Sequence, residues 1–65
     1  MDSNAYEIRF QSLWQEGRAL CFPCDEEGHV QLDHLSERAR DNYLYARAVI
    51  GREYAYPMVR PSAAH

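Results

Sequence analysis

The sequence predicts an α+β fold in which a small antiparallel sheet of three to four strands packs against one long helix. Two patterns support this prediction. Apolar residues alternate with charged ones near the N-terminus, as in a half-buried strand, and apolar residues recur with helical period after residue 35. A sheet and a helix that are each apolar on one side can bury both of those sides against each other. At 65 residues, the chain has room for one thin core.

The first predicted strand covers residues 5–10 and the second covers residues 18–24. In the first, apolar side chains stand two residues apart and therefore share one side of the extended chain, with charged side chains on the other. In the second, Pro23 has no N–H to give to a ladder, so this strand should lie at a sheet edge or end there.

Between the second strand and the helix, the sequence predicts a tight turn and a third strand. Residues 25–28 are acidic and end in Gly28, which can adopt the positive φ that many turns require. The chain is then expected to return as a short strand over residues 29–32. Residues 18–32 would in that case form a β-hairpin.

The helix is expected to begin after Asp33, whose carboxylate suits the N-cap, and to end at Gly51, which suits the position after a helix C-terminus. Its main apolar stripe consists of Leu35, Ala39, Tyr43, Ala46 and Val49 or Ile50. Residues 52–59 then predict a fourth strand or an extended tail, because Pro57 and Pro61 disfavour more helix.

The whole chain is expected to form one domain over residues 1–60, followed by a disordered tail over residues 61–65. The N-terminal residues are polar and acidic, unlike a signal peptide, and no apolar run approaches the ~20 residues that cross a bilayer. The sequence therefore predicts a cytoplasmic protein that does not associate with membranes, in which Cys21 and Cys24 stay reduced.

The charge and the size of the chain argue against two classes of function. The net charge is −3, from ten acidic and seven basic residues, and all seven bases are arginine. Because there is no run of bases to meet a phosphate backbone, we do not expect nucleic-acid binding. A chain this short also has little material for a rigid scaffold around a pocket. We therefore predict that the protein is not an enzyme.

Four residues with metal-ligand side chains lie within fourteen positions, in the spacing C-x2-C-x4-H-x4-H: Cys21, Cys24, His29 and His34. Zinc takes thiolate and imidazole ligands in a tetrahedron, so a closed zinc site fits these residue types. The strand prediction opposes it, because Cys21 and Cys24 would point to opposite faces of a strand and could not share a metal. We therefore expect no metal cofactor and keep a zinc-stabilised module as the alternative.

The same segment resembles a zinc knuckle. That family has an aromatic residue after its first cysteine and a glycine before its histidine, and Phe22, Gly28 and His29 stand at those positions. The resemblance implies a zinc module that binds single-stranded nucleic acid. Two departures count against it. His34 stands where the family has its last cysteine, and residues 25–27 are acidic where the family usually carries bases.

A larger part of the chain resembles small uncharacterised proteobacterial proteins. The resemblance lies in short runs of sequence: Arg18-Ala-Leu, Phe22-Pro-Cys-Asp, Leu35-Ser-Glu-Arg-Ala-Arg, Asn42-Tyr-Leu and Gly51-Arg-Glu. It implies a bacterial protein and no particular activity, because these runs match the expected strand end, helix and helix stop.

The predicted helix carries a second apolar strip, away from its main stripe. Leu44, Tyr45 and Ala48 form this helix strip, and Arg40 and Arg47 lie at its rim. Tyrosine and arginine are enriched among the residues that dominate binding at interfaces. Either Leu44 packs under the C-terminal segment, or the strip contacts a partner. We predict a non-catalytic protein-interaction module that binds a protein partner or forms a homodimer.

Overall fold

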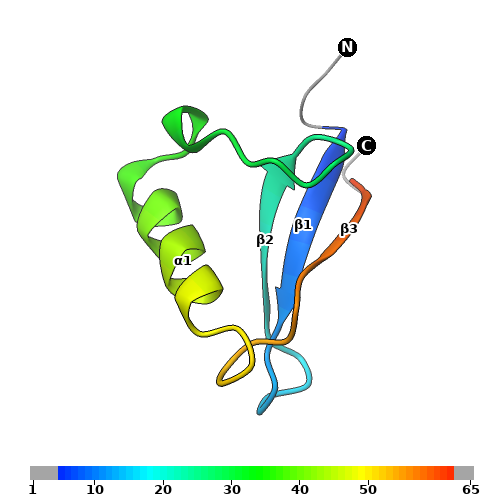
Figure 1. Cartoon of the computed structure of the whole chain (residues 1–65), viewed down its shortest axis with the longest axis vertical. Coiled ribbons are helices and arrows are strands. Elements are labelled where there is room, and N and C mark those ends of the chain that lie inside the picture. The colour runs from blue at the N-terminus through cyan, green and yellow to red at the C-terminus, as the bar shows by residue number, and fades with distance from the viewer. Residues whose placement is uncertain (1–4, 63–65) are drawn as a thin grey trace.

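The computed structural model describes residues 5–62, which form a three-stranded antiparallel sheet and one α-helix (Figure 1). The elements are β1 (Tyr6–Gln11), β2 (Ala19–Cys24), a 3-10 helix η1 (Leu32–His34), α1 (Glu37–Ala48) and β3 (Met58–Pro61). The strand order is β2-β1-β3, so β1 is central and the other two strands are edges. The predicted α+β class is therefore confirmed, with three strands.

One face of the sheet is apolar and is the face on which α1 packs. Along β1 and β2, the buried side chains are every second residue, as the alternation predicted. The rings of Phe10, Phe22 and Tyr43 meet edge to face, with centroid distances of 5.3 to 6.0 Å. Around them lies the rest of the core: Ile8, Cys24, Ala46 and Tyr54. Tyr43 is thus the helix residue that joins α1 to the sheet.

The helix begins three residues later than Asp33 would allow. Its N-cap is Ser36, whose hydroxyl accepts a hydrogen bond from the Ala39 N–H at 3.1 Å. The prediction of Asp33 was wrong because residues 32–34 form a separate 3-10 turn, after which the chain is extended at Leu35. None of the helices in the described part of the chain has the length and apolar character that a bilayer span requires.

The helix ends at Ala48, and Gly51 lies in the turn that follows it. Gly51 has the positive φ that its prediction as a helix stop requires, at +86°. The turn is held by the carbonyl of Val49, which accepts hydrogen bonds from the N–H groups of Arg52, Glu53 and Tyr54. The helix therefore ends close to the predicted position. Gly51 is not at the helix end itself but in the turn that follows it.

The predicted third strand over residues 29–32 and the hairpin over residues 18–32 were wrong. β2 pairs instead with β1, through a register that places Ile8 opposite Phe22. After its turn, the chain crosses toward α1 without entering the sheet, and Val30 and Leu32 pack against the core. Two apolar residues spaced two apart fit a crossing segment that packs on the core as well as they fit a β-strand. Their alternation therefore could not distinguish between these two structures.

The segment after the helix adds the third strand to the free side of β1. β3 places Val59 opposite Ile8 and ends at Pro61, and the Ser62 N–H donates to the Ala5 carbonyl at 2.8 Å. The prediction of a disordered tail from residue 61 is therefore corrected for the first two residues of that tail. Residues 63–65 lie outside the described part of the chain.

The backbone hydrogen bonds show which groups of the edge strands face outward. In an antiparallel ladder, alternate residues direct both their N–H and C=O groups to the neighbouring strand. The bond from Ser12 N–H to Arg18 C=O, at 2.9 Å, leaves Ala19, Cys21 and Pro23 facing away from β1. By the same alternation, Pro61 faces outward on β3. The prediction that Pro23 lies on an edge strand is confirmed.

Candidate functional site

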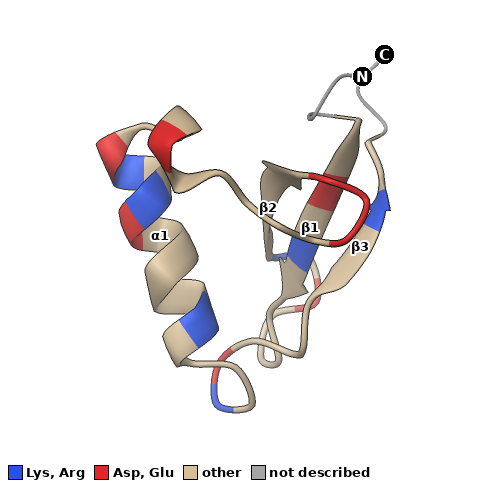
Figure 2. Cartoon of the chain, turned by 45° about the horizontal axis from the view of Figure 1, so that its top comes forward, with Lys and Arg blue, Asp and Glu red and all other residues tan. Residues whose placement is uncertain are grey.

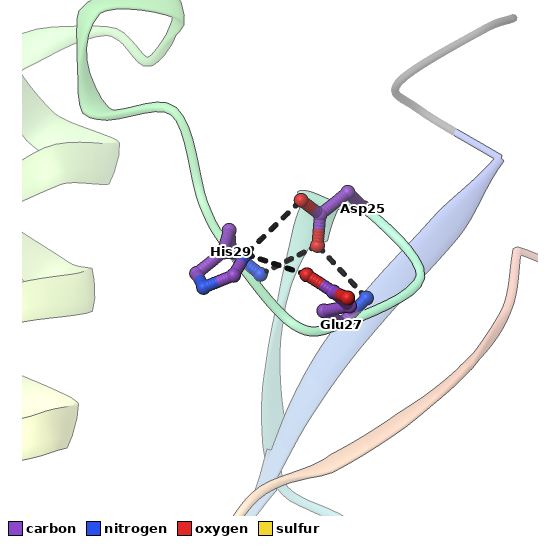
Figure 3. A group of neighbouring side chains, drawn as sticks. All are labelled: Asp25, Glu27 and His29. Carbon is purple, nitrogen blue, oxygen red and sulfur yellow. Dashed lines mark hydrogen bonds and ion pairs between the residues drawn. The ribbon is translucent and has the colours of Figure 1, made fainter.

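The turn between β2 and η1 gathers the carboxylates of Asp25 and Glu27 and the imidazole of His29 (Figure 3). We call residues Asp25–His29 the acidic turn. One carboxylate oxygen of Asp25 accepts hydrogen bonds from the backbone N–H groups of Glu27, at 2.9 Å, and His29, at 2.8 Å. The backbone closes the turn as well, because Gly28 N–H donates to Asp25 C=O at 3.0 Å. Asp25 therefore determines the shape of this turn.

The acidic turn lies over the sheet, against β3 (Figure 2). Gly28 has a φ of +91°, and a Cβ built there would lie 3.0 Å from Val59 Cγ2. The position thus requires glycine twice, for its backbone conformation and for the close approach of Val59. The three acidic residues are held next to the apolar face of the sheet by this contact.

His29 brings its imidazole ring close to both carboxylates. Its Nδ1 lies 3.2 Å from an Asp25 oxygen and 3.6 Å from a Glu27 oxygen. The pKa of the Asp25 carboxyl is lowered, chiefly by the hydrogen bond from the His29 backbone N–H. Burial is the next-largest cause and opposes the shift, and the His29 ring and the Glu27 N–H lower the pKa further. Asp25 is therefore ionised over the whole neutral range.

The ligand atoms of Asp25, Glu27 and His29 lie within 4.8 Å of one another. Within residues 5–62, this is the one group of three or more His, Cys, Asp or Glu residues with such spacing. Two oxygens and one imidazole nitrogen are a donor set that Zn²⁺ or Mn²⁺ can accept. The same atoms also serve the turn itself, because both Asp25 oxygens already accept or contact groups of residues 27 and 29.

The four ligands that the sequence offered for zinc do not converge. Cys21 is exposed on the outer face of the sheet, whereas Cys24 is 2% exposed and lies in the core. The predicted divergence of the two thiols is confirmed, because β2 stays extended through Cys24. Cys24, His29 and His34 do line one small cavity together with Asp25. Burial raises the pKa of the Cys24 thiol, and the nearby charges of Asp25 and Glu7 raise it further.

The helix strip divides between two hollows. Leu44 and Arg47 line an open groove between α1, the acidic turn and β3, whose apolar walls are Ile8, Val30, Tyr43, Pro57 and Val59. We call it the Leu44 groove. Tyr45 instead faces a second hollow on the other side of α1. Arg40 is half-buried and Ala48 is exposed. The C-terminal segment thus lies opposite Leu44, which is still 50% exposed.

Arg47 is held at the edge of the Leu44 groove by Tyr43, one helical turn earlier. Its guanidinium lies 5.8 Å from the centroid of the Tyr43 ring, and its Nη1 donates to the Tyr43 hydroxyl at 3.4 Å. Because Tyr43 is itself packed in the core, Arg47 contacts a residue whose position is fixed. The groove therefore combines apolar walls with a cation on its helix side, Arg47, and a carboxylate on its turn side, Glu27.

Sequence reasoning missed Trp14 and Glu53, which line the second hollow with Tyr45. The Trp14 side chain is 76% exposed, and its indole N–H donates to the Arg52 carbonyl at 2.9 Å. A hydrogen bond to Glu53 is the main cause that raises the pKa of Tyr45. Sequence reasoning also missed Pro57 and Val59, which line the Leu44 groove. The one available signal was that apolar residues continue after Gly51 although the helix stops there.

The arrangement defines a small α+β domain with two exposed hollows beside one helix. No protein-family model, curated protein or solved structure matches the chain. The zinc-knuckle and proteobacterial resemblances therefore stay predictions.

Proposed function

We propose that the chain is a small non-catalytic protein-interaction module that uses the Leu44 groove as its contact surface. The partner is a second protein or another copy of this chain. The observation that carries the proposal is the pair Leu44 and Val59, which are 50% and 39% exposed on different elements and line the same groove. Contiguous exposed apolar surface of this kind is typical of binding sites.

The energetic argument is that these side chains gain from being covered. Burial of apolar surface contributes about 25 cal/mol per Å². The exposed half of Leu44 does not gain this stabilisation in the free monomer and would gain it when a partner covers it. Arg47 adds a cation at the rim, where its guanidinium lies over the Tyr43 ring. A partner with an apolar side chain, and with an acidic group on the side that meets Arg47 and not Glu27, would match the groove.

Light scattering after gel filtration, over a concentration series, tests the self-associating form. Leu44→Lys should shift the protein toward monomer, because it places a charge in the groove. Leu13→Lys is the matched control, since Leu13 is 45% exposed and does not line the groove. Equal behaviour of both variants would reject the groove as the interface between copies.

A photo-crosslinking residue tests the form with a second protein. Placed at position 44, it should give a discrete protein adduct in cells that produce this chain, and at position 13 it should not. Adducts of the same kind from both positions would show collisional labelling and contradict the proposal.

A zinc-stabilised module that binds single-stranded nucleic acid is a second candidate. It is favoured by one observation, namely that Cys24, His29 and His34 line one cavity together with Asp25. Metal analysis of the purified protein tests it. Cys24→Ser should abolish zinc binding and Cys21→Ser should not. A metal-free protein with a cooperative unfolding transition would end this candidate.

A further inference from the structure

The second hollow lies between two loops that meet at one end of the sheet (Figure 1). We call it the Trp14 hollow. The first loop, residues 12–18, joins β1 to β2, and the second, residues 49–57, joins α1 to β3. The backbone ties the two loops together, because Leu13 N–H donates to Glu53 C=O at 3.0 Å. The hollow is therefore formed by the fold itself.

Trp14 is held in place although its ring is exposed. The side-chain amide of Gln11 donates to carbonyls of the first loop, the nearest at 2.9 Å. The Ser12 hydroxyl accepts hydrogen bonds from the N–H groups of Trp14 and Gln15, both at 3.1 Å. The indole N–H is bonded to the Arg52 carbonyl of the second loop. The indole thus offers its faces to a ligand, and little freedom remains to be lost on binding.

The charges around the Trp14 hollow favour a neutral ligand. Arg18 and Glu53 both line the hollow. The two loops carry one further charge of each sign, Glu16 and Arg52, and neither of these lines it. A cation would therefore meet Arg18, and an anion would meet Glu53. An uncharged ligand meets neither repulsion.

The polar side chains of the hollow offer both donors and acceptors. Arg18 and Gln15 carry side-chain N–H groups that make no hydrogen bond to other groups of residues 5–62. Glu53 accepts a hydrogen bond from the Tyr45 hydroxyl, and a carboxylate has further acceptor sites. Hydroxyl groups match such a surface, because each one can donate and accept.

The size and the aromatic walls of the hollow restrict the ligand further. Its volume is about 230 Å³, below the ~300–1,000 Å³ of pockets that take drug-sized molecules, so it has room for one ring. Trp14, Tyr45 and Tyr54 line it with aromatic rings. The faces of such rings are negative and attract polarised C–H groups. A ring with hydroxyls at its edge and C–H groups on its face fits both kinds of wall.

We propose that the Trp14 hollow binds a neutral sugar ring. The C–H face of the sugar packs on the Trp14 indole, and its hydroxyls bond to Arg18, Gln15 and Glu53. This binding site goes beyond the proposed protein-interaction function, because it lies on the other side of α1 from the Leu44 groove.

Fluorescence of the whole chain tests this inference directly, because Trp14 is its one tryptophan. Titration with glucose, galactose, mannose and N-acetylglucosamine should give a saturable change for at least one of them. We expect a Kd on the order of 1–10 mM, since one ring in an open hollow buries little surface. Tetramethylammonium chloride and inorganic phosphate should give no saturable change.

Two outcomes of these titrations would overturn the inference. The first is the absence of saturation with every sugar up to about 100 mM, well above the expected Kd. The second is saturation by tetramethylammonium or by phosphate without saturation by a sugar, which would make the hollow a site for ions.

Variants locate the sugar, with binding followed by amide chemical shifts in NMR because Trp14→Ala removes the fluorophore. Trp14→Ala should weaken binding at least about tenfold, and Tyr56→Ala is the matched control, since Tyr56 is 80% exposed and does not line the hollow. Glu53→Gln should weaken binding several-fold and Glu16→Gln should not, and this pair decides the matter if Trp14→Ala does not fold. Equal affinity of Glu53→Gln and Glu16→Gln would contradict the site.

The same titration separates this inference from the proposed function. Leu44→Lys should leave the sugar affinity unchanged, whatever it does to the association of copies. A loss of sugar binding in Leu44→Lys would place the sugar in the Leu44 groove and overturn the inference.

Discussion

The ring of Tyr43 on α1 meets the ring of Phe22 on β2 edge to face, with centroids 5.3 Å apart and planes at 83°. Phe10 contacts both rings at 6.0 Å, so three aromatic side chains from three elements close the core. The hydroxyl of Tyr43 points to the edge of this cluster, where it accepts a hydrogen bond from Arg47.

Tyr43→Ala should lower the free energy of unfolding by about 3 kcal/mol or more, because it removes the ring that joins α1 to the sheet and leaves a cavity. Tyr43→Phe keeps the ring and loses only the bond to Arg47, so it should cost less than about 1 kcal/mol. Urea unfolding of both variants measures the difference. Equal losses would contradict the aromatic cluster as the source of the stability.

Ser36→Ala should destabilise the protein by about 1 kcal/mol, because the Ala39 N–H loses its capping acceptor. Asp33→Ala should have almost no effect, since Asp33 lies in η1, outside the helix. Thermal unfolding of the two variants compares them. A larger effect at Asp33 would restore the cap that the sequence suggested.

Gly28→Ala should destabilise the acidic turn by about 1–2 kcal/mol from the positive φ alone, with a further loss from the contact of its Cβ with Val59. Gly51→Ala shares the positive φ but meets no atom within 4 Å, so its effect should be the smaller. Chemical denaturation of both variants provides the comparison. Adding Val59→Ala to Gly28→Ala should recover part of the loss, and no recovery would argue against the close approach.

Acid should weaken the fold through Asp25. Its folded pKa lies below the ordinary value of 3.8, so its ionised form is favoured by folding. The stabilisation is present in full above the unfolded pKa and is lost as the pH falls through the folded pKa. Unfolding curves taken between neutral pH and strong acid should therefore show a decline below about pH 4 that Asp25→Asn reduces. Glu26→Gln is the control, because the Glu26 side chain is exposed and makes no hydrogen bond to any side chain or backbone group of residues 5–62.

The α+β fold could be predicted from the spacing of the apolar residues alone. A two-residue repeat indicates a strand, a helical repeat indicates a helix, and the apolar side of each needs a partner surface. The path of residues 29–34 did not follow. Asp33 and Ser36 are both good N-cap residues, and only the 3-10 turn at residues 32–34 decides between them. The 3-10 turn depends on the packing of Val30 and Leu32 against a core that other elements form.

The candidate site was predictable only in part for a related reason. Leu44 stood out as an apolar residue away from the main stripe of the helix. Its groove, however, is completed by Pro57 and Val59, which β1 brings into place from the far end of the chain. Cys21 and Cys24 were separable from the sequence because strand geometry fixes opposite faces for residues three apart.

The central position of β1 also orders events as the chain leaves the ribosome. Its pairing with β2 needs only the short loop between Gln11 and Ala19, and such local closure is fast. Among the described residues, its other side has no partner until Met58–Pro61 has been made, the last of the described elements in chain order. A nascent chain of this protein therefore carries an open flank on β1 from the time β1 has been made until β3 has been made.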